Sequence, residues 1–158
     1  MAGIPTVEKM VNIAKALGNI ISGDNKFNEL DYNTDLITRM IMTEAYENPG
    51  EWQAMANVVK NRNNRGYGFT IAEEGSTDIE KLIMSGDFHG VFDNEERFNN
   101  AQSTKQRKNK YNKIYEVVEN VMIGDLSDNT NGATMYQKKK IEDGKKIGDH
   151  YYWNLYNE

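Results

Sequence analysis

Glu44 is the residue whose type and spacing point most directly to chemistry. It continues a helical stripe of apolar residues that includes Ile37, Met40 and Ile41, so its carboxylate falls on the side meant for the core. Such a carboxylate is costly unless it is paired or kept for a reaction, and the C-terminal end of a helix disfavours negative charge further. Both effects favour the protonated form, which a general acid requires. Periodicity alone favours another interpretation, a structural Glu that pairs with an Arg or a backbone amide.

Other chemistry is limited by what the composition lacks. The 158 residues contain no cysteine, which excludes a cysteine nucleophile and a thiolate metal site. Only His89 and His150 supply imidazole groups, and they are far apart in the sequence, which weakens the hypothesis of a zinc site. The formal net charge of −5 gives no overall basic field for nucleic acid. The basic residues within 105–110 and 138–140 could still contact an anionic polymer.

The sequence shows neither a membrane span nor a signal peptide. No apolar run approaches the roughly 20 residues that cross a bilayer. Residues 1–5 lack a basic region followed by a continuous apolar core. Residues 7–21 mix apolar and charged positions, which predicts an amphipathic helix instead.

Hydrophobic spacing and capping residues predict a mainly α-helical (α+β) chain with a small β or irregular part near the C-terminus. Thr6 and Thr34 are candidate N-caps, and Gly23 and Gly124 stand where helices would end. We expect helices over residues 6–22, 34 to the turn at 48–50, 51–63, 77–84 and 111–123.

The remaining segments are predicted to be less regular. Residues 24–33 are polar and predict a linker, and residues 87–92 predict an extended or looped segment. A charged stretch is predicted to hold helix from about Glu95 onward. The runs 133–136 and 147–153 are typical of short strands or of extended walls of a cleft.

Five short motifs occur in an order that resembles a known family. Thr43-Glu44-Ala45 is followed by a small-residue helix that ends in Asn61-Arg62, and then by Asp87-Phe88-His89-Gly90-Val91. Gly132-Ala133-Thr134-Met135-Tyr136 comes next, and Ile147-Gly148-Asp149-His150-Tyr151-Tyr152 completes the series. From about Leu36 to Tyr152, the chain is similar to the spore-cortex-lytic and cell wall hydrolase family typified by SleB. It departs from that family at Asp87, where Gln is frequent, and at His89, where Ser is common.

The resemblance implies a lysozyme-like single domain over residues 34–158, preceded by an N-terminal helix and linker over 1–33. It implies cleavage of peptidoglycan between N-acetylmuramic acid and N-acetylglucosamine, by a lytic transglycosylase or a muramidase, without a cofactor or a metal. Glu44 is then the general acid/base. It protonates the glycosidic oxygen and afterwards deprotonates the sugar 6-hydroxyl, which closes an anhydro ring. Hydrolysis would instead need a partner carboxylate at about 5 to 9.5 Å.

Three carboxylates are candidates for such a partner. Glu47 lies one turn beyond Glu44, Glu51 follows the Pro-Gly turn, and Asp149 belongs to the last motif. We interpret Glu47 as an exposed helix end, Glu51 as a charge that favours a helix N-terminus, and Asp149 as a turn residue.

Six further residues are candidate substrate-binding groups. Thr134 and Tyr136 can donate hydrogen bonds to sugar hydroxyls or the N-acetyl group, or can orient the acid. Phe88 and Tyr151 can line sugar subsites, although aromatic residues more often pack in a core. The two histidines can orient the acid or hold a loop. The candidates are Phe88, His89, Thr134, Tyr136, His150 and Tyr151.

Peptidoglycan is the partner that the resemblance implies, with no role for nucleic acid or membrane insertion. A catalytic domain without a signal peptide is typical of a bacteriophage lysin, either virion-associated or released from the host cytoplasm at lysis. Two other hypotheses stay open. One is a non-catalytic virion, structural or wall-binding protein on a lysozyme-like scaffold. The other is a metal-dependent amidase that uses His89 and His150.

Overall fold

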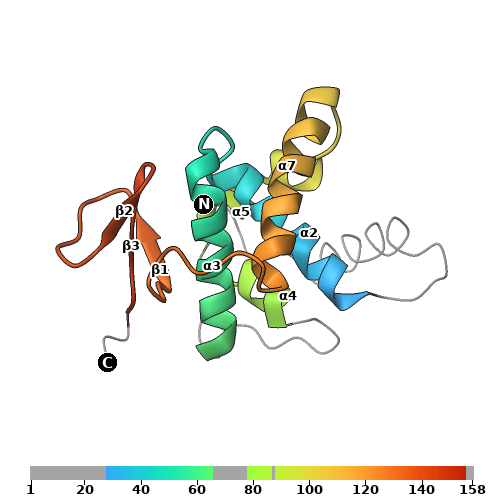
Figure 1. Cartoon of the computed structure of the whole chain (residues 1–158). Coiled ribbons are helices and arrows are strands. Elements are labelled where there is room, and N and C mark those ends of the chain that lie inside the picture. Colours follow the sequence, from blue (N-terminus) through green and yellow to red (C-terminus); the bar gives the residue numbers. More distant parts are fainter. Residues whose placement is uncertain (1–27, 66–77, 87, 156–158) are drawn as a thin grey trace.

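The computed structural model describes residues 28–65, 78–86 and 88–155. This part of the chain is mainly helical and carries a small three-stranded antiparallel sheet near its C-terminus, which lies beside α3 (Figure 1). Among these residues, none of the helices combines the length and the apolar character needed to cross a bilayer. The elements are α2 (Glu29–Glu44), α3 (Pro49–Arg65), α4 (Asp78–Ile83), α5 (His89–Asp93), α6 (Glu95–Asn99), α7 (Lys105–Met122), β1 (Met135–Gln137), β2 (Lys145–Ile147) and β3 (His150–Trp153).

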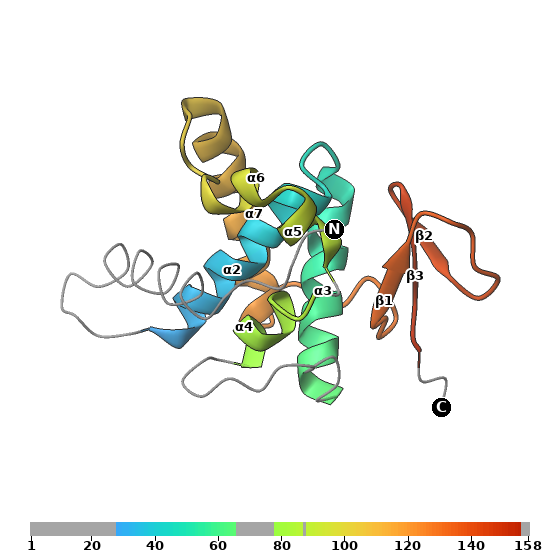
Figure 2. The same cartoon turned by 180° about the vertical axis from the view of Figure 1, so that it is seen from behind.

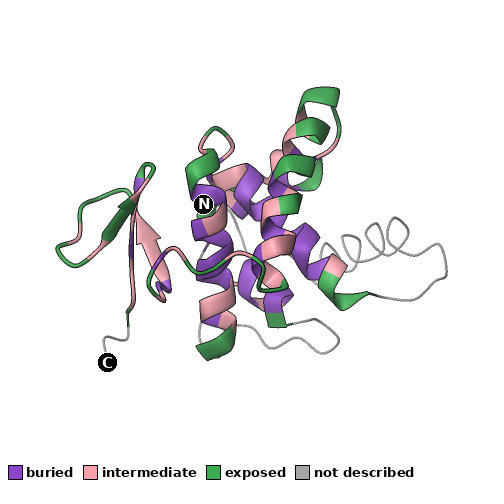
Figure 3. Cartoon of the chain, in the orientation of Figure 1, coloured by how far each residue is buried: buried purple, intermediate pink, exposed green. Residues whose placement is uncertain are grey.

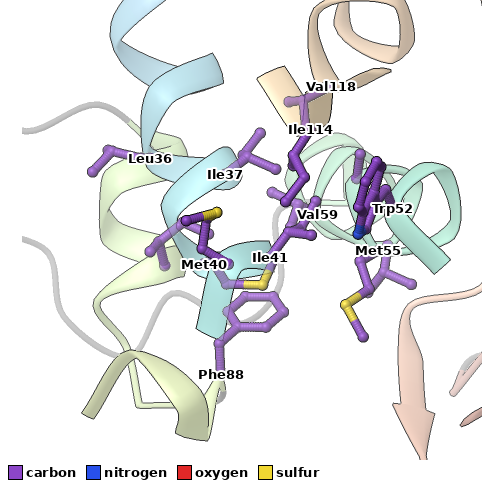
Figure 4. Close-up of a cluster of buried hydrophobic side chains, with 14 of the residues drawn as sticks. Leu36, Ile37, Met40, Ile41, Trp52, Met55, Val59, Phe88, Ile114 and Val118 are labelled. Atoms are coloured by element: carbon purple, nitrogen blue, oxygen red, sulfur yellow. The ribbon is translucent and has the colours of Figure 1, made fainter. Parts of the chain in front are cut away.

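Helix α2 is the centre of the core. Leu36, Ile37, Met40 and Ile41 have no exposed surface, which confirms the apolar stripe predicted for this helix. α2 packs against α7 and against each of the helices α3 to α6. Figure 4 shows side chains of α2 grouped with those of α3 and α7 and with Phe88. Figure 3 shows that buried residues occur along much of both α2 and α3. The burial of α2 along most of its length fixes the position of its last residue.

The start of α2 differs from the prediction. Asn28 caps the helix by accepting a hydrogen bond from an N–H of the first turn, so residues 29–33 are helical where a linker was predicted. Thr34, predicted as the N-cap, lies inside the helix and its hydroxyl donates to the carbonyl of Leu30 at 2.7 Å. A threonine hydroxyl that bonds back in this way is compatible with a helix interior. The helix predicted over residues 6–22 lies outside the described residues.

The later helices agree with the prediction in part. α3, α4, the start of α6 and the end of α7 are confirmed to within two residues. Pro49 begins α3 instead of lying in a turn, a position that suits proline because no N–H is needed there. The extended segment predicted over 87–92 is wrong, since residues 89–93 form α5. α7 starts at Lys105 and not at residue 111, because Thr104 caps it there.

The sheet has the strand order β1-β3-β2, and both pairs are antiparallel. β1 and the central strand β3 confirm the extended runs predicted over 133–136 and 147–153, whereas β2 comes mainly from a basic segment for which no strand was predicted. Gly148 opens the two-residue turn between β2 and β3 at a φ of 58°, a conformation that favours glycine. Along β3, His150 and Tyr152 are buried and Tyr151 is partly exposed. His150 and Tyr152 therefore face the helices.

The C-terminal half of α3 holds the segment that leads into β1. The Asn61 side chain donates to the carbonyl of Ala133 at 3.0 Å, and Arg62 Nε donates to the carbonyl of Thr134. Asn61 and Arg62 therefore join α3 to the segment that precedes β1.

A buried polar network joins α2 to α6 and α7. Arg39 Nε donates to Asp35 at 2.9 Å, and its Nη1 donates to the carbonyls of Phe98 and Asn99 at 2.9 and 3.1 Å. The Tyr111 hydroxyl donates to the other oxygen of Asp35. Burial raises the pKa of Asp35, and the Arg39 charge and the Tyr111 hydrogen bond oppose that effect. Every member of the network therefore depends on the others.

Replacement of Arg39 by Ala removes the charge that balances Asp35 and leaves two carbonyls without this donor. We expect the substitution to lower the free energy of unfolding by about 3–5 kcal/mol, as for other broken buried ion pairs. Urea unfolding followed by circular dichroism measures the loss. Lys81→Ala is the control, because Lys81 meets the largely exposed Asp78 at 3.8 Å and such a pair contributes about 0.2–1 kcal/mol. Similar losses for the two variants would contradict the role of Arg39.

Candidate active site

Glu44 is the last residue of α2, at the point where the helix leaves the core. Met42 is fully buried, whereas Thr43 and Glu44 are partly exposed. The N–H of Gly90 donates to Glu44 Oε1 at 2.8 Å. No described residue donates a hydrogen bond to the other oxygen, Oε2. Among the described residues, hydrogen bonding therefore holds the carboxyl group at one oxygen only.

Gly90 approaches Glu44 so closely that a side chain would not fit. A Cβ atom at this position would lie 2.6 Å from Thr43 Oγ1 and 3.0 Å from Glu44 Oε1. α5, which carries Gly90, packs beside α2 (Figure 2). Glycine therefore allows the backbone of α5 to reach the carboxyl group directly.

Glu51, in the first turn of α3, has a fully buried carboxylate. Its Oε1 accepts a hydrogen bond from the Tyr152 hydroxyl at 2.7 Å and lies 2.7 Å from His150 Nδ1. Its Oε2 accepts a hydrogen bond from the N–H of Asp149 at 3.3 Å. Burial and the bond to Glu51 raise the pKa of Tyr152 well above its usual value. The last sequence motif is thus folded around this carboxylate.

The sequence interpretation of Glu51 as a helix-terminal charge missed this role. Glu51, Met55, Val58 and Arg62 are all buried and follow one another at spacings of four, three and four, which is one face of a helix. The argument that singled out Glu44 from its apolar stripe applies equally to Glu51. The spacing therefore indicates a buried position for Glu51, but an acid in the first turn of a helix also stabilises that helix while exposed to water.

The other two candidate partner carboxylates lie in solvent. The Glu47 side chain is 77% exposed, and Lys110 lies 4.0 Å from it. Asp149 is exposed and accepts a hydrogen bond from Asn48 at 3.1 Å. Their predicted positions, at an exposed helix end and in a turn, agree with the structure.

Tyr136 lies within the electrostatic reach of both central carboxylates. Burial, the charge on Glu44 and the charge on Glu51 raise the pKa of Tyr136 well above its usual value, while Arg62 acts in the opposite direction. Its hydroxyl therefore keeps its proton at neutral pH and can donate a hydrogen bond. None of the described residues forms a hydrogen bond with this hydroxyl.

Aromatic rings surround Tyr136. Its ring centroid lies 5.2 Å from that of His150, 5.6 Å from that of Tyr152 and 6.3 Å from that of Phe88. The His150 ring meets it edge-on. These contacts come from β3 and from the residue before α5, so the cluster joins the sheet to the segment that holds Glu44.

The structure brings only some of the predicted binding residues to Glu44. Tyr136 and His150 are part of the cluster. Phe88 is also part of it but is only 1% exposed and packs under the Arg62 guanidinium at 4.8 Å, so it is a core residue and not a platform for a sugar ring. His89 is adjacent in the chain and exposed.

Thr134 and Tyr151 point elsewhere. Thr134 is fully buried, and its hydroxyl accepts a hydrogen bond from the N–H of Leu155 at 3.1 Å. Tyr151 is on the outer face of β3, where its ring lies 5.9 Å from Lys146 Nζ. Neighbouring residues of a strand face opposite sides, so His150 and Tyr151 could not both face the helices.

Comparison with known proteins does not assign the chain to a family. No family model, no curated protein and no solved structure matches the chain. Within the described ranges, no group of three His, Asp or Glu side chains is arranged to hold a metal ion, so nothing there supports a metal-dependent amidase. The functional assignment therefore depends on the site itself.

The turn at Gly148 offers a test of the buried Glu51. A Cβ atom at Gly148 would lie 2.5 Å from Glu51 Cγ, whereas at Gly124 it would meet nothing within 4 Å. Both glycines have positive φ, 58° and 88°, so both Ala variants pay about 1–2 kcal/mol for backbone conformation. We expect Gly148→Ala to cost about 1–3 kcal/mol more because of the clash. Urea unfolding of both variants measures the difference, and equal losses would mean that the turn does not depend on Glu51.

Proposed function

We propose that the chain cleaves the glycan strand of peptidoglycan, between N-acetylmuramic acid and N-acetylglucosamine, as a lytic transglycosylase with Glu44 as the acid/base. The resemblance of the sequence motifs to cell wall hydrolases supports the substrate class. The observation that carries the proposal is the Glu44 carboxyl group, which is partly buried and, among the described residues, accepts a hydrogen bond at Oε1 only, from Gly90. An acid with this environment has one oxygen for the protein and one for the substrate.

The reaction needs one proton donor that is regenerated. The Glu44 carboxyl group donates its proton to the glycosidic oxygen while the bond from that oxygen to the sugar C1 breaks. The sugar 6-hydroxyl then attacks C1, and its proton returns to the Glu44 carboxylate. The products are a strand with a new hydroxyl end and a strand with a 1,6-anhydro end, and no water is consumed.

Tyr136 is suited to orient the substrate next to the acid. Its phenol is protonated and forms no hydrogen bond with the described residues, so it can donate to a sugar oxygen or to an N-acetyl carbonyl. The charge on Glu44 contributes to the raised pKa of Tyr136, which supports a role for the two groups at one site.

The environments of the neighbouring carboxylates favour a mechanism with one acid. Glu51 is enclosed and occupied by the last motif, and Glu47 and Asp149 are exposed. None of these three is both open to a substrate and partly withdrawn from water. A muramidase would need a second carboxylate of that kind.

Glu44→Gln tests the assignment because glutamine keeps the size and an oxygen at this position but cannot transfer a proton. We expect the rate of solubilisation of purified peptidoglycan to fall by at least about 10²-fold, the lower end for loss of general acid–base catalysis. The matched control, Glu47→Gln, removes an exposed carboxylate three residues away and should keep the wild-type rate. Equal activity of Glu44→Gln and wild type would refute the role of Glu44.

Mass spectrometry of the wild-type digest separates the competing reactions. Anhydromuramic ends support the transglycosylase, whereas reducing muramic ends would mean that water attacks and would make the protein a muramidase. A well-folded wild-type protein that is inert on several peptidoglycan types would favour the non-catalytic scaffold.

Gly90→Ala tests the support of the acid without removing it. The new methyl group would overlap Thr43 Oγ1 and press on Glu44 Oε1, so the carboxyl group must move. A displacement of about 1 Å at a catalytic group can lower the rate by about 10²-fold. We therefore expect the rate of peptidoglycan solubilisation, followed by the fall in turbidity, to drop by about 10- to 100-fold. Gly50→Ala is the control, because a Cβ atom there meets nothing within 4 Å. An unchanged rate for Gly90→Ala would mean that this contact does not position the acid.

A further inference from the structure

Two cations converge on the ring of Tyr46, just beyond the candidate acid. The Arg97 guanidinium carbon lies 4.6 Å from the ring centroid, and Lys110 Nζ lies 4.9 Å from it. Lys110 Nζ is also 5.9 Å from the ring of Trp52. We call Tyr46, Arg97 and Lys110 the Tyr46 cluster. Its cations come from α6 and α7, and neither contributes to the hydrogen bonds that hold Glu44 or Glu51.

The charges of the Tyr46 cluster are only partly balanced. The neighbouring Arg107 is satisfied, because its two terminal nitrogens bond the two oxygens of Glu96 at 2.7 and 2.8 Å. Within the described part of the chain, the one carboxylate paired with Lys110 is that of the largely exposed Glu47, at 4.0 Å. Arg97 Nε is buried and has no hydrogen-bond partner among the described residues. A buried donor in that state is costly.

The position of the cluster relative to Glu44 is fixed. Tyr46 follows Glu44 by two residues, so their Cα atoms are at most about 7 Å apart. Trp52 Nε1 donates to the carbonyl of the intervening Ala45 at 2.9 Å, which holds this link against α3. A ligand at the cluster would therefore lie close to the end of α2 that carries Glu44.

We propose that the Tyr46 cluster binds a carboxylate of the peptide stem that the substrate carries on its muramic acid. A guanidinium and an ammonium beside an aromatic face suit a carboxylate. The stem begins on the sugar whose bond is cleaved, so its carboxylates are the anions that the substrate itself brings within reach. This inference rests on the proposed function and adds to it a preference for glycan that still carries its stems.

Binding measured without catalysis keeps this inference separate from the proposed function. The Glu44→Gln protein is titrated with N-acetylmuramyl-pentapeptide and with the same compound whose carboxylates are amidated. We expect the free acid to bind at least about tenfold more tightly, the size of one charged contact. Arg97→Gln with Lys110→Gln should remove that difference. Arg97→Lys, which keeps the charge but not the fork of donors, should remove part of it.

The same titration supplies a control and the results that would contradict the inference. Lys113→Gln changes an exposed lysine of α7 and should leave the preference intact, which excludes a general effect of charge. Equal binding of the free and amidated compounds, or an unchanged preference in the double variant, would overturn the inference. So would a glycerol phosphate oligomer that binds through Arg97 and Lys110 while the stem does not, because the site would then belong to a phosphate polymer.

Cleavage adds a second readout. On peptidoglycan freed of teichoic acid, wild type should cleave stem-bearing strands faster than strands stripped by an amidase, and the ratio of the two rates should fall toward one in the double variant. An unchanged ratio would overturn the inference even if both rates are high. A wild type that is inert on both substrates yet binds the free acid would count against the proposed function and not against this site.

Discussion

The buried carboxylate of Glu51 is the constraint on which the arrangement of sheet and helices depends. A carboxylate removed from water is strongly destabilising unless hydrogen bonds replace the lost hydration. Here the replacements come from the segment 149–152. The described helices therefore do not supply the hydrogen bonds that the Glu51 carboxylate needs. The last motif must pack against α3 to supply them. Gly148 permits this docking, because any side chain there would displace the carboxylate.

This constraint also positions the site. β1 pairs with β3 so that Tyr136 lies opposite Tyr152, and the bond that fixes Tyr152 on Glu51 thereby fixes Tyr136 as well. On the other side, α2 is buried up to Met42 and becomes partly exposed within its last two residues. The acid at its end is thus carried by a helix that cannot shift without disrupting the core. The core therefore positions Glu44 through α2, and the buried Glu51 positions Tyr136 through the pairing of β1 with β3.

The sequence predicted most of the helical framework and one of the two central carboxylates. Glu44 stands out in the sequence because an acid that continues an apolar stripe is costly unless it is paired or used in a reaction. The buried role of Glu51 is not evident from the sequence, because an acid in the first turn stabilises a helix without any partner. Its partners lie about 100 residues later in the chain, and sequence spacing does not indicate that they contact it. Thr34 was mistaken for a cap because its hydroxyl can bond either a free N–H or a carbonyl of the preceding turn. Tyr151 was grouped with His150 because the predicted strand had no assigned register, and register decides which side chains face the core.

The structural use of Glu51 bears on the choice between attack by water and attack by the sugar. A second carboxylate that activates water must be open to it, and none of Glu47, Glu51 and Asp149 is both open and partly withdrawn from bulk solvent. On the proposed mechanism a single acid suffices, because the nucleophile is a hydroxyl of the substrate and is already held close to the reacting carbon. The remaining requirement is that water should not compete for that carbon. In the proposed mechanism, the partly buried position of Glu44 serves this requirement because it limits the access of water to the carboxyl group.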